Sequence, residues 1–202
     1  VYNDKHMGNC AEMCADKYSI SREEQDEYAI RSYKRAQETI ATKKFDSEIV
    51  PLEIPTKKSA IVVNTDEEPS RVSFDKLKTL RPVFQKDGSV TAGNASTIND
   101  GAAACLIMSS SKAKELGLRP LASIEGHCSF SQSPEWFTTS PIYSTKKLLN
   151  QINMDINDID LFEINEAFSV VTLAAIKDLE LDIDKVNIYG GAVSMGHPIG
   201  AS

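Results

Sequence analysis

A histidine and an asparagine stand where the sequence predicts the ends of two short buried strands. Asn165 follows the segment 160–164, DLFEI, and His197 follows the segment 187–189, NIY, after a glycine-rich loop. Catalytic groups collect at the carboxyl ends of parallel strands in an α/β sheet, so we expect both side chains to face one cleft. A neutral imidazole placed there can take a proton from a nucleophile.

The neighbours of His197 bear on its protonation. Gly196 precedes it and Pro198 follows, and proline suits the first turn of a helix because its missing N–H has no partner there. The field at a helix start disfavours an imidazolium, so we expect a neutral ring near pH 7. A loop histidine with no chemical task fits the same spacing equally well.

The elements that must position these residues follow from periodicity and capping. Ser21 and Glu24 form a capping box that predicts a long helix to about Thr42, with Arg31, Lys34 and Arg35 facing water. Further helices are predicted at 143–152 and 169–179. Strands are predicted at 48–54, 60–64 and 121–126.

Composition limits the possible classes of function. With 41% hydrophobic and 25% charged residues, the chain reads as an ordinary globular protein, and no apolar run approaches the length of a membrane span. A net charge of -7 argues against a nucleic-acid partner, because phosphate contacts need a basic surface. An anionic ligand would therefore need a local basic patch. The segment 71–86 is basic and could supply one, although a charge run is more often only a solvated face.

The four cysteines lack the spacing of a zinc site or a disulfide scaffold, which favours a reducing compartment. We expect each to be a small buried apolar residue. They are Cys10, Cys14, Cys105 and Cys128.

Four motifs occur in a fixed order: HMG at 6–8, VTAGNASTINDGAAA at 90–104, NEAF at 165–168 and GGAVSMGHPIGAS at 190–202. Together they resemble the thiolase family, and within it the acetoacetyl-CoA thiolases (acetyl-CoA acetyltransferases) of the potassium-dependent mitochondrial type. The resemblance implies an α/β thiolase fold with a layered αβαβα core, present here only in part because both ends of the family's chain are missing.

The resemblance also implies a division of the chain. Residues 1–87 would be part of the α+β loop domain, 88–117 the end of the N-terminal core domain, and 118–202 part of the C-terminal core domain. The implied partners are acetyl-CoA, acetoacetyl-CoA and CoA, in a homodimer or homotetramer without a covalent cofactor. The implied compartment is the mitochondrion, with the cytoplasm as the alternative.

The implied reaction is the reversible condensation of two acetyl-CoA molecules through an acetylated cysteine. His197 would be the base, and Asn165 would hold a water of an oxyanion hole beside His197, with Glu166 orienting Asn165. The family's two catalytic cysteines fall outside this sequence. The residues implied to bind the CoA thioester are His6, Met7, Arg71, Phe84, Ala92, Ser96, Ile98, Phe137 and Phe168.

A K⁺ site is implied as well. Its ligands would be the Tyr33 hydroxyl and the carbonyls of Ala92, Gly93, Ala95 and Val193, and small residues let backbone oxygens converge on a large cation. Alternatively, Tyr33 is simply a core residue. Two other functions stay open: a long-chain 3-ketoacyl-CoA thiolase, and a non-catalytic protein of the same fold that binds acyl-CoA or lipid.

Overall fold

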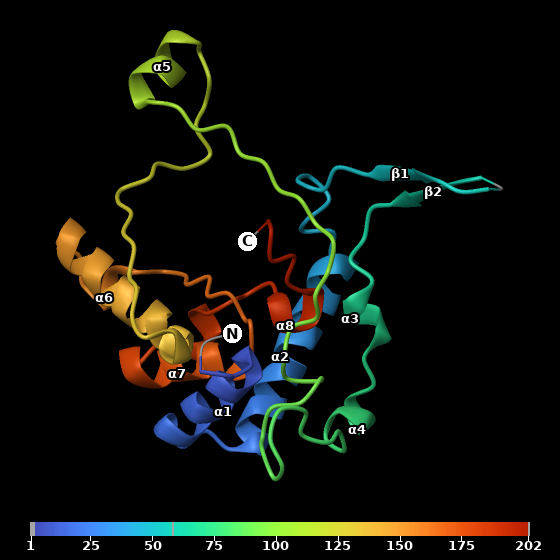
Figure 1. Cartoon of the computed structure of the whole chain (residues 1–202). Coiled ribbons are helices and arrows are strands. Elements are labelled where there is room, and N and C mark those ends of the chain that lie inside the picture. The colour runs from blue at the N-terminus through green and yellow to red at the C-terminus, as the bar shows by residue number, and fades with distance from the viewer. Residues whose placement is uncertain (1–2, 58, 202) are drawn as a thin grey trace.

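The computed structural model describes residues 3–57 and 59–201, so Ser202, the last residue of the glycine-rich motif, lies outside the described residues. Most of the described regular structure is helical, and it gathers into one body from which an arm and a hairpin project (Figure 1). The elements are α1 (Met7–Tyr18), α2 (Arg22–Ala41), β1 (Leu52–Pro55), β2 (Ala60–Val63), α3 (Glu68–Arg71), α4 (Phe74–Leu77), α5 (Ser110–Glu115), η1 (Pro134–Thr139), α6 (Ser140–Ile152), η2 (Ile156–Asp158), α7 (Ser169–Leu179), η3 (Ile183–Lys185) and α8 (Ala192–Met195).

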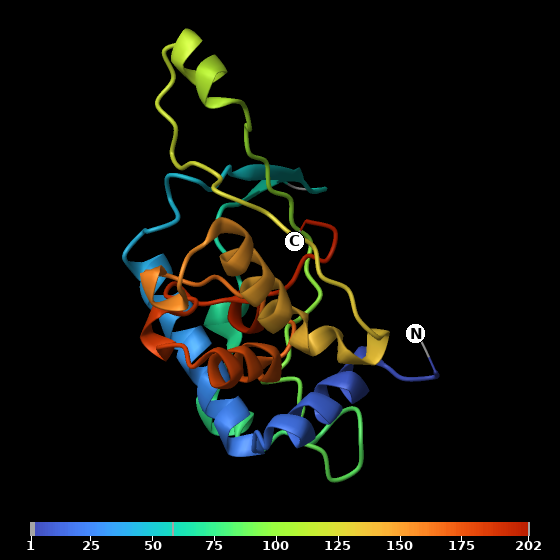
Figure 2. The same cartoon turned by 90° about the vertical axis from the view of Figure 1, so that its left-hand side faces the viewer.

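Helix α7 is the centre of the body, because α1, α2 and α6 all pack against it (Figure 2). Its first seven residues, Ser169 to Ala175, are all buried, as expected for a helix with an apolar surface on every side. The predicted helix at 169–179 is therefore confirmed with these bounds.

Helix α2 begins at the predicted capping box. The Ser21 hydroxyl accepts the Glu24 N–H, and the Glu24 carboxylate accepts the Ser21 N–H. The prediction that Arg31 and Arg35 face water is wrong. Arg31 pairs with the Asp184 carboxylate and Arg35 donates to the Val186 carbonyl. Both side chains are half-buried, and they tie α2 to η3 and to the residue that follows it.

Strands β1 and β2 form an antiparallel hairpin in which Leu52 pairs with Val63 and Pro55 with Ala60. Strand β2 lies within the predicted segment 60–64, whereas β1 is shorter than the predicted segment 48–54 and ends one residue beyond it. Their side chains are exposed on both faces, and the hairpin extends away from the helical body (Figure 1).

The irregular segments on either side of α5 form an arm with α5 at its tip. Both views show this arm projecting from the body (Figures 1 and 2). The strand predicted at 121–126 is absent from the described residues, and Leu121 is fully exposed there. A strand needs a neighbour for its backbone hydrogen bonds, and no described segment pairs with this one. The strands predicted at 160–164 and 187–189 do not form among the described residues, and only an isolated parallel bridge of Phe162 with Val186 remains there. In the described part of the chain, no helix is both long and apolar enough to span a membrane.

Candidate active site

Asn165 and His197 lie in contact. The amide nitrogen Nδ2 of Asn165 is 3.3 Å from Nε2 of His197, and the tautomer of the ring decides which atom donates. Asn165 is exposed and His197 is half-buried. The structure thus brings together the two residues that the strand ends are predicted to bring together.

The segment that leads to Asn165 is held by the segment 185–187. The Phe162 N–H donates to the Lys185 carbonyl at 2.9 Å, and the Asn187 N–H donates back to the Phe162 carbonyl at 2.9 Å. The Asn187 side chain then bonds both backbone groups of Ile164, each at 2.8 Å. The residue before Asn165 is therefore fixed on two sides.

His197 is fixed from the other direction. Its N–H donates to the Thr97 carbonyl at 2.8 Å. Gly196 has a φ of +90°, and a β-carbon there would lie 2.1 Å from Oδ1 of Asn99, so only glycine fits before the histidine. The helix predicted to begin at Pro198 is a turn over the described residues 198–201. The expectation that His197 lies at the start of a helix is therefore wrong. In the described residues, α8 ends at Met195, before the histidine.

Three residues predicted to contact the CoA thioester form an aromatic row. The His6 ring stacks on Phe84 with centroids 4.8 Å apart, and Phe84 meets Phe168 edge to face at 6.1 Å. A backbone bridge joins Ala95 to Phe168, and Ser96 donates its N–H and its hydroxyl to the Ala167 carbonyl. The start of α1, the segment 90–98 and the NEAF segment thus meet at one place.

The remaining predicted CoA residues are dispersed around this place. Phe137 lines a cavity of about 410 Å³ together with Asn165, and Ile98 forms a bridge with His197 while its side chain is exposed. Met7 and Ala92 are exposed. Arg71 lies on α3, where it pairs with Glu67 and Glu68 and lines a separate cavity of about 440 Å³.

Three of the residues predicted to bind K⁺ lie at one buried cluster. Tyr33 and Val193 pack in one buried cluster with Leu77, and Gly93 lies against the Leu77 side chain. Burial, followed by the charge of Glu68, raises the pKa of the Tyr33 hydroxyl. Ala95 forms a backbone bridge with Phe168. Among residues 3–57 and 59–201, no group of three His, Cys, Asp or Glu side chains could hold a metal ion.

Glu166 bonds segments far from Asn165 in the sequence. Its carboxylate is fully buried, and each of its oxygens accepts bonds from α2 and from the segment 187–193. The expectation that Glu166 orients Asn165 stays a prediction, to which the structure adds these contacts. A signal was present in the sequence: Tyr28 and Ser32 place hydroxyls four residues apart on the apolar stripe of α2, where a buried polar partner is required.

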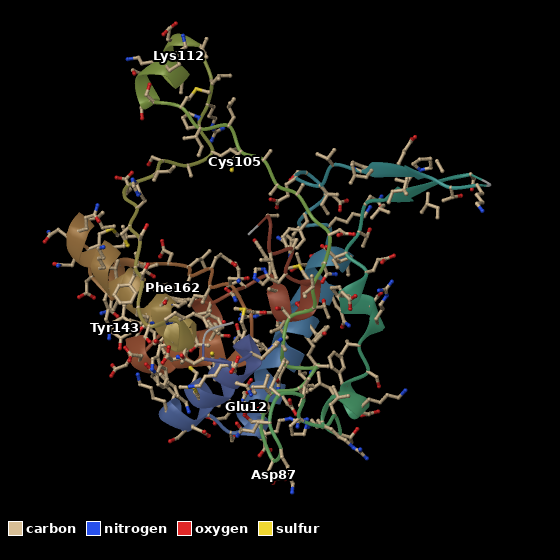
Figure 3. All side chains as sticks on the ribbon, in the orientation of Figure 1. Glu12, Asp87, Cys105, Lys112, Tyr143 and Phe162 are labelled. Atoms are coloured by element: carbon tan, nitrogen blue, oxygen red, sulfur yellow. The ribbon has the colours of Figure 1, made fainter. Side chains whose placement is uncertain are left out.

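The cysteines divide into two pairs. Cys10 and Cys14 are buried, and burial raises the pKa of both thiols. Cys105 is exposed on the arm, as Figure 3 shows, and Cys128 is half-buried with its thiol 3.3 Å from the Ser144 carbonyl. The expectation that all four are buried is therefore wrong for Cys105 and Cys128.

Comparison with known proteins places this geometry in a family. Residues 1–111 match "Thiolase, N-terminal domain", and residues 118–202 match "Thiolase, C-terminal domain". The chain belongs to the thiolase family. It is 53% identical over its whole length to an acetyl-CoA acetyltransferase of Schizosaccharomyces pombe, of which it covers 52%, and 52% identical to a mitochondrial acetyl-CoA acetyltransferase of Rattus norvegicus, of which it covers 48%.

Solved structures agree with the sequence matches. An acetyl-CoA acetyltransferase of Bacillus anthracis superposes with a TM-score of 0.96 at 44% identity, over 99% of this chain and 51% of that one. A thiolase of Ascaris suum in complex with coenzyme A gives a TM-score of 0.93 at 44% identity, over 98% of this chain and 51% of that one. The fold is therefore the α/β thiolase fold in part, and the chain spans about half the length of the curated relatives it matches.

Proposed function

We propose that the protein containing this chain is an acetyl-CoA C-acetyltransferase, which condenses two acetyl-CoA molecules to acetoacetyl-CoA and CoA or runs the reverse thiolysis. The observation that carries the proposal is the contact of 3.3 Å between Asn165 and His197. It occurs in a chain about half identical to acetyl-CoA acetyltransferases over its whole length.

His197 is the base in this proposal. Its imidazole takes the proton of the nucleophilic cysteine, which the thiolase resemblance places outside this chain, and the thiolate attacks the thioester carbonyl. The carbonyl oxygen becomes negative, and collapse of the intermediate expels the CoA thiolate. Asn165 donates to a water that, beside Nε2 of His197, holds a thioester oxyanion. The contact between the two side chains supports one shared oxyanion site.

The CoA arm would follow the aromatic row. His6, Phe84 and Phe168 offer apolar surface to pantetheine, and the Ser96 hydroxyl, which donates to the Ala167 carbonyl, keeps lone pairs that can accept an amide N–H. Arg71 would bind the adenine end. Its ion pairs with Glu67 and Glu68 are exposed, and pairs of that kind exchange at little cost.

We further propose that the protein is activated by K⁺. The packing of Tyr33 against Val193, with Gly93 on the same cluster, supports a cation that braces the CoA loop against the histidine loop. Ala92 and Ala95 would add backbone oxygens.

We also propose a homodimer or homotetramer located in mitochondria. The rat and mouse relatives, each 52% identical, are called mitochondrial, which supports that compartment over the cytoplasm. The division into a loop domain to residue 87 and two core domains that meet at residues 117–118 belongs to the same proposal.

The experiment is a substrate comparison with the full-length protein. We expect kcat/KM to be at least about tenfold higher for acetoacetyl-CoA than for a long-chain 3-ketoacyl-CoA, because pocket contacts discriminate substrates by their transition-state binding. A preference for the long chain would instead support the long-chain thiolase. Binding of CoA without turnover of either substrate would support the non-catalytic alternative. The 202-residue chain alone should show no turnover.

A further inference from the structure

Glu166 is a buried carboxylate between the two loops that carry Asn165 and His197. Its side chain has no solvent exposure, and four donors converge on it. One oxygen accepts from Tyr28 Oη at 2.7 Å and Asn187 Nδ2 at 2.8 Å. The other accepts from Ser32 Oγ at 2.7 Å and from the Val193 N–H at 3.1 Å.

A carboxylate in the interior is tolerated when donors satisfy its oxygens, and here each oxygen receives two bonds. Burial, together with the charge of Glu166, raises the pKa of the Tyr28 hydroxyl well above its ordinary value. Tyr28 therefore remains a donor at neutral pH. The carboxylate and its donors form a complete network, which is rigid because any displaced member leaves a buried group unsatisfied.

One side of this network reaches Asn165. The Asn187 amide that donates to Glu166 also donates to the Ile164 carbonyl at 2.8 Å, and its oxygen accepts the Ile164 N–H at 2.8 Å. Glu166 follows Asn165 directly in the chain. Asn165 is thus held between Ile164 and Glu166, which are both tied to Asn187.

The other side reaches His197. A β-carbon on Gly191 would lie 2.3 Å from the carboxyl carbon of Glu166, so the loop backbone lies directly against the carboxylate. The Ser32 hydroxyl accepts the Gly191 N–H at 3.0 Å while it donates to Glu166. The loop that leads to His197 is therefore fixed to Glu166 and to α2 at the same time.

We propose that Glu166 is a positioning residue that sets the separation of Asn165 and His197. It acts through Asn187 on one loop and through the backbone of residues 191–193 on the other. Catalytic groups must be held closely, since a displacement of about 1 Å can cost on the order of 100-fold in rate. The inference rests on the proposed function for its kinetic test, whereas its structural test is independent of activity.

Glu166→Gln is the discriminating variant. Its NH₂ group must face either the Val193 N–H or the Asn187 amide, and two donors then meet without an acceptor. In the full-length protein we expect kcat for acetoacetyl-CoA to fall at least tenfold while KM stays within about twofold. In a crystal structure of the variant, Asn165 and His197 should lie beyond hydrogen-bond reach.

Glu12→Gln is the matched control. The Glu12 carboxylate is also buried, at 3% exposure, and it accepts the N–H and hydroxyl of Ser89 and the N–H of Val90. Both variants lose a buried acceptor and should lower Tm similarly, yet Glu12→Gln should keep kcat within about twofold. If Glu166→Gln does not fold, Ser32→Ala, which removes one donor to Glu166, is measured against the same criteria.

The outcomes separate the two proposals. Native kcat in Glu166→Gln, or equal falls of kcat in both variants, would overturn the positioning role. An unchanged contact between Asn165 and His197 in the variant structure would overturn it as well. A native full-length protein without thiolysis would instead count against the proposed function, and the crystal structure of the variant would still decide the role of Glu166.

Discussion

The side chains of Asn165 and His197 meet at 3.3 Å although 32 residues separate them in the sequence. Each loop is fixed by a different segment: Asn187 bonds the residue before Asn165, and the Thr97 carbonyl accepts the His197 N–H. The contact therefore depends on packing between distant parts of the chain. A base and an oxyanion donor placed in this way can serve a single thioester carbonyl.

Asn165→Ala should lower kcat by about 100- to 1000-fold, the usual loss when an oxyanion donor is removed, with KM for acetoacetyl-CoA changed less than about threefold. Steady-state kinetics of the full-length protein measures both constants. Asn157→Ala is a fair control, because the Asn157 side chain bonds Asp155 on the surface. A kcat of Asn165→Ala within about threefold of the native value would remove Asn165 from the mechanism.

Tyr33→Phe should abolish the response to K⁺. In the native enzyme we expect K⁺, compared with Na⁺ at equal ionic strength, to lower KM for the CoA thioester more than it raises kcat, because the ion would brace the CoA loop. Tyr18→Phe, which removes a hydroxyl bonded to Asp178, should keep the native response. Identical kinetics of the native enzyme in both salts would sink the idea of a K⁺ site.

Tyr28→Phe should flatten the loss of stability at alkaline pH. Because the pKa of Tyr28 is raised in the folded state, its contribution to stability is fully present below the unfolded value of about 10. Above that pH the unfolded chain releases the proton first, so stability falls by up to about 1.4 kcal/mol per pH unit. Urea unfolding of both proteins between pH 9 and 11 measures the difference. Parallel curves would show that Tyr28 contributes nothing to the slope.

Local signals predict the helices well. The capping box at Ser21 and Glu24 and the apolar run at 169–179 both give helices with the expected bounds, because capping and burial act on neighbouring residues. The strands are harder to predict. The segment 121–126 has the composition of a strand, but its backbone finds no partner in the described part of the chain.

The site could be predicted as far as the positions of Asn165 and His197, since strand ends and a glycine loop mark them. Two features depend on long-range packing instead. Periodicity predicts that Arg31 and Arg35 face solvent. In the structure, Arg31 pairs with Asp184 and Arg35 donates to the Val186 carbonyl. In the sequence, Glu166 is the residue next to Asn165. Its hydrogen-bond partners on α2, Tyr28 and Ser32, lie more than 130 residues away.

His197→Ala tests the central claim most directly. In the full-length protein we expect kcat for thiolysis of acetoacetyl-CoA to fall by about 100- to 10,000-fold, the range for loss of a general base, with the Kd for CoA measured by calorimetry changed less than about twofold. His127→Ala, which alters an exposed histidine on the arm, should leave both values at the native level. Turnover of His197→Ala within a few-fold of the native rate would contradict the account.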